Sequence, residues 1–250
     1  MRHLRGQAGF SLVEMMISMV IGLVLVAGAY RLFIGSTTTY KQQDDLSRLQ
    51  ENVRLATQVL AQDIRLAGYP RFAMNGAPFA GTPVTATNNP SALPCTTGCS
   101  DTIAVSYTNS AGNLTTVTFS IVGSVLQRNE TAPVPPMVSG PVVDGVENMQ
   151  VLYGMDTDPT DQMQSVDVPY QDTLAGGGQV IAVQVRLLMR TTNEIPEAAL
   201  DTACYDVDGL ATTPAAAVAP CLAGQEFNPV DDRRLRRIFT TTITLRNQLQ

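Results

Sequence analysis

The 250-residue sequence predicts an α+β fold, in which one long N-terminal helix packs on a domain of antiparallel β-sheet. Residues 10–34 form an apolar run that is long enough to cross a bilayer. Residues 35–68 then carry apolar residues three or four positions apart, as in an amphipathic helix. Residues 69–250 alternate short β-branched and aromatic runs with segments rich in Gly, Pro, Asn and Thr. The helix is therefore predicted to span a membrane with its first half and to cover a sheet with its second.

Residues 1–9, before the apolar run, form a positively charged leader. A secretory signal peptide has its small-residue cleavage site after the apolar region. Here the small residue, Gly9, comes first, so a cut after Gly9 leaves the apolar run attached behind a new terminus at Phe10. Positive residues beside a first helix stay in the cytoplasm. The sequence therefore predicts a protein that crosses the inner membrane once and holds residues 69–250 in the periplasm.

Glu14 is an acid at the edge of the predicted membrane-spanning helix. An acid near a bilayer is costly and needs a partner or a function. Together, the leader, the Gly9–Phe10 junction and Glu14 resemble the type III signal of type IV pilins and type II secretion pseudopilins. The resemblance implies that a prepilin peptidase cuts after Gly9 and methylates Phe10, and that Glu14 pairs with a neighbouring subunit's amino terminus during assembly. A plain signal anchor with a stray acid is the alternative.

Charge and composition argue against nucleic-acid binding and against an enzyme. The formal net charge is −6, and loss of the leader's two arginines leaves −8. Electrostatic binding to nucleic acid needs a basic surface instead. The single histidine, His3, lies in the leader, so the mature chain has no histidine to act as a general base or metal ligand. We therefore expect no enzymatic activity and no cofactor.

Four cysteines, Cys95, Cys99, Cys204 and Cys221, lie beyond the membrane helix, where thiols are oxidised. Three pairings are possible. We favour Cys95–Cys99 and Cys204–Cys221, because each pair flanks a turn-rich loop. A zinc site is the alternative, but without histidine it needs four thiolates, and these spacings are not the usual close pairs.

Two charged segments are weaker candidates for sites. Asp156, Asp158 and Asp161 are closely spaced, and oxygen-rich loops can hold calcium. The sixth position of that loop is Asp161, where an EF-hand has glycine, so a solvated acidic loop is the simpler interpretation. Residues 231–237 read Asp-Asp-Arg-Arg-Leu-Arg-Arg, which we interpret as a solvated, self-neutralising turn before the last strand, with a subunit contact as the alternative.

The expected elements follow from these patterns. A helix is expected over residues 11–67, with Leu49, Ala56 and Leu60 on its apolar face and Asp45 and Asp63 on its polar face. The predicted strands comprise a hairpin of residues 102–108 and 114–122, a strand at 125–129, one that ends the stretch 142–153, and two more at 180–190 and 237–246. Residues 71–101 and 193–232 are expected to be long loops.

Five stretches in this order resemble the minor pilin W family (PilW): Asp63–Tyr69, Asp144–Val146, Val151–Asp156, Val183–Leu188 and Phe239–Asn247. The resemblance implies a type IV pilin-like fold and a minor pilin that helps to initiate and stabilise the pilus near its tip. The implied partners are other minor pilins, the major pilin, the prepilin peptidase and the inner-membrane assembly platform. A type II secretion pseudopilin of the J type, or an adhesin module at the tip that uses the two long loops, are the alternatives.

Overall fold

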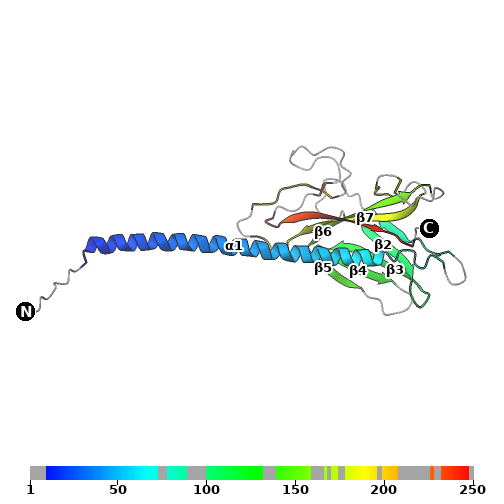
Figure 1. The fold of residues 1–250 in the computed structure, drawn as a ribbon, viewed down its shortest axis with the longest axis horizontal. Coiled ribbons are helices and arrows are strands. Elements are labelled where there is room, and N and C mark those ends of the chain that lie inside the picture. Colours follow the sequence, from blue (N-terminus) through cyan, green and yellow to red (C-terminus); the bar gives the residue numbers. More distant parts are fainter. Residues whose placement is uncertain are drawn as a thin grey trace, which may run out of the picture. The chain divides into compact units, whose positions relative to one another are not determined.

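The computed structural model describes residues 10–72, 78–88, 100–131, 139–158, 166–167, 170–173, 178–195, 199–207, 226–227 and 232–247. These residues belong to two compact units, Met1–Asp44 and Asp45–Gln250. The elements are α1 (Leu12–Ile64), β1 (Val84–Thr87), β2 (Thr102–Thr108), β3 (Leu114–Val122), β4 (Val125–Thr131), β5 (Gly140–Asp144), β6 (Val146–Asp156), β7 (Gln179–Arg190), β8 (Tyr205–Asp206), β9 (Glu226–Phe227) and β10 (Arg236–Thr244). The long N-terminal helix and the antiparallel sheets confirm the predicted α+β fold (Figure 1).

The helix α1 is continuous through residues 35–39, which read Gly-Ser-Thr-Thr-Thr. The hydroxyls of Thr37 and Thr38 donate to the carbonyl of Ile34 at 2.8 and 3.1 Å, and Thr39 donates to Gly35 at 3.0 Å. Each hydroxyl therefore shares a carbonyl one turn back with a helical amide, and the threonines are accommodated without a break in the helix.

The C-terminal part of α1, from Asp45 onward, buries one face in the second unit. Leu49, Ala56, Leu60 and Ile64 are at most 3% exposed, and their three- and four-residue spacing places them on a single stripe. This stripe packs against buried side chains from both larger sheets, including Ile103, Val105, Val117, Phe119, Val151, Val183, Val185 and Ile243. The predicted apolar face is thus confirmed as a face of the core.

The first sheet is an antiparallel meander of five strands in the order β1-β2-β3-β4-β5. The predicted hairpin of residues 102–108 and 114–122 is confirmed, since Ile103 pairs with Phe119 and Thr108 pairs with Leu114. Strand β1 was not predicted, because it lies in the segment expected to be a loop. Its four residues are too short to show a pattern, and they form a strand by pairing with β2.

The second large sheet has the strand order β10-β7-β6, with β7 in the centre. In the view of Figure 1, β3, β4 and β5 lie below the C-terminal part of α1, and β6 and β7 lie above it. The chain passes from one sheet to the other at Gly145, whose φ is +85°. A Cβ there would lie 2.7 Å from the carbonyl oxygen of Arg190, so both the backbone conformation and the close approach require glycine.

The segment 193–232 contains two short strands, so its assignment as a loop throughout was wrong. Strand β8 pairs with β9, and Asp201 forms an isolated bridge with Asp232. Tyr205 and Val207 pack against Leu188 and Ile238 on the outer side of the β10–β7–β6 sheet. Two-residue strands have no detectable period, and only their distant partners define them.

Candidate functional site: the amino-terminal helix and the charged contacts of the domain

Phe10 and Glu14 lie at the start of α1 on a fully exposed surface. Phe10 is 87% exposed. The carbonyl of Ser11 accepts the first helical hydrogen bond, from the amide of Met15 at 3.1 Å. Ser18 donates to the backbone carbonyl of Glu14 at 2.7 Å, and no described residue donates to the Glu14 carboxylate. Gly9 lies outside the described residues, so the cleavage, the methylation and the role of Glu14 remain predictions.

The apolar residues of α1 before the second unit are exposed around the helix. Examples at 60–80% exposure are Met15, Met19, Val24, Leu32 and Phe33. A soluble monomer rarely exposes so much contiguous apolar surface. The helix is long and apolar enough to cross a membrane by length and composition. This surface fits a membrane-anchored chain, because bilayer or neighbouring helices would cover what the chain itself leaves open.

A buried ion pair ties the end of α1 to the first sheet. Arg128 on β4 donates its Nε–H to Asp63 at 2.7 Å and an Nη1–H to Glu130 at 2.9 Å. Asp63 is only 5% exposed. Asp63 and Asp45, which the sequence places on the polar face of the helix, are therefore both buried: Asp45 is 8% exposed and accepts a hydrogen bond from Asn193 at 3.1 Å. Both acids sit beside the apolar stripe, where partners from distant segments compensate their burial.

A larger charged network centres on Arg236, the first residue of β10, whose side chain is completely buried. It donates to Glu147 at 2.6 Å, to Asp232 at 2.8 Å and to Asp201 at 3.0 Å. Arg190 joins the network through Glu147 at 2.8 Å. The interpretation of residues 231–237 as a solvated turn was therefore wrong for Arg236. Its three carboxylate partners come from β6 and from the segment before β10, and no sequence signal connects them.

Opposing effects act on the pKa of Arg236. Burial lowers it, but hydrogen bonds to Glu147 and Asp232 outweigh burial and raise the pKa above its ordinary value. The guanidinium therefore stays charged, and the fork geometry of arginine satisfies several carboxylate oxygens at once. This network joins β10, β6 and the Asp201 and Asp232 loops.

Asp232 gives the network a pH dependence. Burial opposes its ionisation, but hydrogen bonds from Arg236 and from the Arg234 amide outweigh burial and hold the pKa of its carboxyl below the ordinary 3.8. A carboxyl group whose pKa is lower in the folded state than in the unfolded state stabilises the fold at pH values above its unfolded-state pKa. This contribution is lost as the pH falls through the folded-state pKa. We expect the melting temperature of the full chain to decrease when the pH is lowered below about 4.

Two variants test this dependence. Asp232→Asn should flatten the acid part of the melting profile, whereas Glu51→Gln, at an exposed position of α1, should keep the wild-type shape. A profile for Asp232→Asn that matches the wild type at every pH would show that Asp232 does not set the acid limit.

In the part of the acidic loop after β6 that the structure describes, the carboxylates accept hydrogen bonds from backbone amides of the same loop. Asp156 is 3% exposed and accepts the Asp158 amide at 3.1 Å. Asp167 accepts the amides of Thr157 and Asp158 at 2.9 and 3.3 Å. Asp161 lies outside the described residues, and the described residues alone contain no group of three potential metal ligands. The calcium candidate is therefore not tested.

Cys204 is disulfide-bonded. Cys95, Cys99 and Cys221 lie outside the described residues, so the favoured pairing remains a prediction. A sulfur in a disulfide is not the thiolate that zinc requires, so this bond argues against the four-thiolate alternative.

Peptide mapping of the oxidised full chain should join Cys204 to Cys221 and Cys95 to Cys99. A disulfide contributes about 2–4 kcal/mol, and more where the closed loop is longer. Loss of Cys204–Cys221 should therefore lower the melting temperature more than loss of Cys95–Cys99. A peptide that joins Cys204 to Cys95 or Cys99 would contradict the pairing.

Comparison with known proteins finds similarity to a curated protein and to a solved structure. The chain is 25% identical over 167 residues to the pilin-like protein PilA3 of Thermus thermophilus. The aligned region covers 58% of this chain and 66% of the relative. The solved type IV-like pilin from Thermus thermophilus aligns with a TM-score of 0.49 and 17% identity, over 81% of this chain and 100% of that chain.

Two family matches cover the helix start and the β domain. Residues 4–30 match the prokaryotic N-terminal methylation motif, which includes Gly9, Phe10 and Glu14. Residues 113–247 match the family described as type IV pilus-assembly protein W, which runs from the β2–β3 turn to the end of β10. This second match covers the Gly145 corner, the Arg236 network and all of the β10–β7–β6 sheet. The chain is a type IV pilin-like protein and belongs to the PilW family.

Proposed function

We propose that this chain is a minor pilin that enters the initiation or tip complex of a type IV pilus and promotes pilus assembly. The observation that carries the proposal is the exposed apolar surface of α1, with Glu14 near its start and no described donor to that carboxylate. A helix with such a surface is stable in a bilayer or among other helices of the same kind. The methylation motif and the PilW match support this role.

The proposed sequence of events follows from chemistry at the amino terminus. The prepilin peptidase cuts after Gly9 and methylates the new amine of Phe10. Before assembly, residues 10–34 hold the chain in the inner membrane, with the new amino terminus on the cytoplasmic side and residues 69–250 in the periplasm. On assembly, α1 leaves the bilayer and enters the filament. Glu14, which lay in polar surroundings near the membrane edge, then pairs with the terminal amine of another subunit. The partners are other minor pilins, the major pilin and the inner-membrane assembly platform.

Amino-terminal sequencing of the native protein tests the processing step. We expect the mature chain to begin with methylated Phe10. A mature chain that begins downstream of Tyr30 would contradict the proposal, because the apolar surface that carries it would have been removed.

Isolation of the membrane complex, followed by mass spectrometry of the copurified subunits, tests the role. Pilus subunits and the pilus assembly platform are the expected partners. Copurification of type II secretion components instead would favour a pseudopilin of the J type. A complex without any pilin-like subunit would refute the assembly role, and glycan or surface binding in that case would favour the adhesin.

A further inference from the structure

Strand β10 is an edge of the β10–β7–β6 sheet, and half of its backbone groups point away from that sheet. The Thr191 amide donates to the Leu235 carbonyl at 2.9 Å, and the Leu245 amide donates to the Ile181 carbonyl at 2.8 Å. These two bonds show that the odd-numbered residues from 235 to 245 bond to β7. In an antiparallel pair the residues between them direct their N–H and C=O groups the other way. On β10 these are Ile238 and the exposed residues Thr240, Thr242 and Thr244.

We call the outward backbone groups of these three threonines the open edge of β10. The opposite edge of the same sheet, on β6, is closed by the chain itself. The Met149 amide donates to the Ser100 hydroxyl at 3.3 Å, and the Met149 carbonyl accepts the Asp101 amide at 2.8 Å. Further along β6, Tyr153 exchanges two backbone hydrogen bonds with Gln171, at 2.7 and 3.0 Å. Loops therefore occupy the positions that an added strand would need on β6.

The edges of the five-stranded sheet are short or interrupted. Strand β1 has four residues, and β5 has five and contains Pro141, which has no N–H to offer. Short edge strands, proline and lysine are the means by which proteins prevent the pairing of their edges with other chains. Strand β10 has nine residues and contains neither Pro nor Lys, and no described strand pairs with its open edge. This long edge is therefore suited to a strand from another chain.

The two faces of β10 define the side chains that such a strand must carry. The outward residues on the polar face, Thr240, Thr242 and Thr244, are exposed. On the other face, Ile243 is 1% exposed, and Phe239 packs against the main core but stays partly exposed. A strand beside β10 would continue both faces, since side chains alternate along a strand. Its residues next to Phe239 would therefore be apolar, and those next to the threonines polar.

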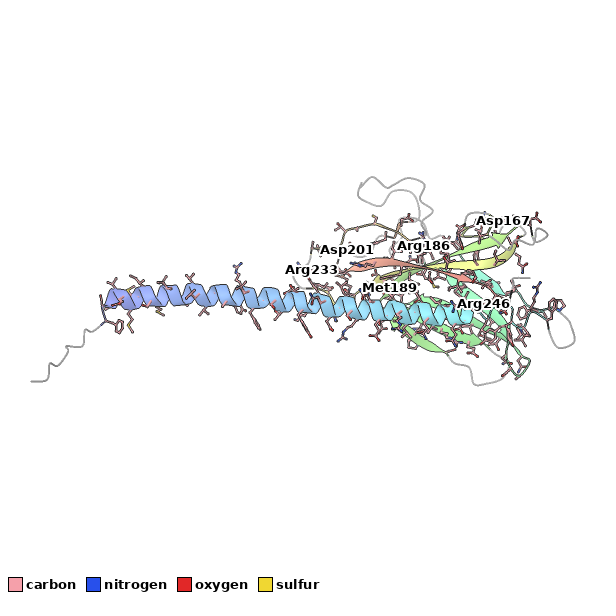
Figure 2. All side chains as sticks on the ribbon, in the orientation of Figure 1. Asp167, Arg186, Met189, Asp201, Arg233 and Arg246 are labelled. Atoms are coloured by element: carbon pink, nitrogen blue, oxygen red, sulfur yellow. The ribbon has the colours of Figure 1, made fainter. Side chains whose placement is uncertain are left out.

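Arginines at both ends of β10 add a preference of charge. Arg237 lies at the start of the strand and Arg246 lies just after its end, and both are exposed. Figure 2 labels Arg233 and Arg246 at opposite ends of the domain, before and after β10. Residues 233–247 contain no Asp or Glu, although the whole chain has a formal charge of −6. An acidic residue near one end of the added segment would complement this edge.

The direction of β10 disfavours a second copy of this chain as the partner. Before β10, the Asn193 side chain donates to Asp45, and after it the Asn247 side chain donates to the Arg65 carbonyl. Strand β10 therefore runs in the same direction as the α1 residues from Asp45 to Ile64. Antiparallel pairing of two β10 strands would point the helices of two copies in opposite directions, whereas chains anchored in one membrane by the same helix end point the same way. An extended segment of a different subunit has no such restriction.

We propose that the open edge of β10 binds an extended segment of a different pilin subunit as an added strand. This segment carries apolar side chains at every second position and an acidic residue near one end. Its main chain pairs with the N–H and C=O groups of Thr240, Thr242 and Thr244, which supplies affinity, and its apolar side chains cover Phe239, which supplies specificity. The inference rests on the proposed function, because the partner is a subunit of that assembly.

Hydrogen exchange of the full chain, resolved to single amides by mass spectrometry, tests the edge without any variant. The isolated protein in detergent is compared with the complex purified from membranes. In the isolated protein the amides of Thr241 and Ile243, which face β7, should exchange slowly, and those of Thr240, Thr242 and Thr244 rapidly. In the complex the three open-edge amides should exchange about tenfold more slowly or less. Slow exchange of these amides in the isolated protein would overturn the inference, because the chain would then cover its own edge.

Site-specific photocrosslinking in native membranes identifies the partner. A photoreactive residue replaces Thr240 at the open edge and, in a second sample, Val24 on the exposed surface of α1. Each sample is prepared in the wild type, in Thr242→Pro and in the matched control Thr242→Val. Proline removes an outward N–H and leaves the bonds between β10 and β7 in place, whereas valine keeps the N–H.

We expect the Thr240 position to capture a peptide of another pilin with alternating apolar residues. Its yield should fall about tenfold in Thr242→Pro, which corresponds to about 1.4 kcal/mol, and stay unchanged in Thr242→Val. An equal melting temperature for Thr242→Pro and the wild type would confirm that the domain is intact, and the exchange comparison decides if it is not.

Three further results would overturn the inference while pilin crosslinks at Val24 keep the proposed function: equal exchange of the open-edge amides in the isolated protein and the complex, an undiminished Thr240 crosslink in an intact Thr242→Pro, or a Thr240 crosslink to lipid or to a second copy of this chain alone. Absence of pilin crosslinks at both positions would overturn the inference and the proposed function together.

Discussion

Arg236→Ala should lower the melting temperature of the domain more than any other single substitution of a charged residue in the described sheets. The side chain is completely buried and donates five hydrogen bonds to Glu147, Asp201 and Asp232. Removal of one partner from a buried charged network costs about 3–5 kcal/mol, because the remaining charges stay buried without compensation. For a domain of this size, that loss corresponds to a decrease of roughly 6–20 °C.

Two variants separate the network from a general effect of arginine loss. Arg237→Ala removes the next arginine, which is exposed, and should change the melting temperature by less than about 2 °C, since exposed substitutions are usually within about 0.5 kcal/mol. Arg236→Lys retains the charge but loses the fork, so its melting temperature should lie between those of the wild type and Arg236→Ala. Equal melting temperatures for Arg236→Ala and Arg237→Ala would refute the structural role of the network.

Glu14→Gln should leave membrane insertion and cleavage intact but reduce recruitment to partner pilins about tenfold or more. The amide keeps the shape of the side chain and loses the charge that attracts a neighbouring amine. An axial step between subunits can bring Glu14 of one chain beside the amine of another, and repetition of this contact gives an open helical array. Attraction between opposite charges is stronger where water is scarce, and a loss of only about 1.4 kcal/mol changes an equilibrium tenfold.

Crosslinking in membranes measures this effect, with Glu51→Gln as the matched control. Glu51 is an exposed acid on the same helix, but it lies in the second unit, beyond the apolar surface. Its variant should crosslink to partner pilins as the wild type does. Undiminished crosslinks in Glu14→Gln would show that Glu14 is not the assembly contact.

The elements that could be predicted from the sequence are those with a long, regular pattern. The apolar run and the stripe through Leu49, Ala56 and Leu60 predicted α1, and the large apolar residues at every second position from Ile181 to Met189 predicted β7. Strand β1 could not be predicted, because four residues do not establish a period and pairing with β2 defines them. For the same reason, β8 and β9 were assigned to a loop.

The amino-terminal site is predicted by the sequence alone, because its elements are local: the leader, Gly9, Phe10 and Glu14 stand within 14 consecutive residues. The charged contacts of the domain were decided only by the tertiary structure. Asp63 meets Arg128 across 65 residues, and Glu147 meets Arg236 across 89. Whether a charge is solvated or paired depends on which distant segments the fold places beside it, and no local pattern carries that information.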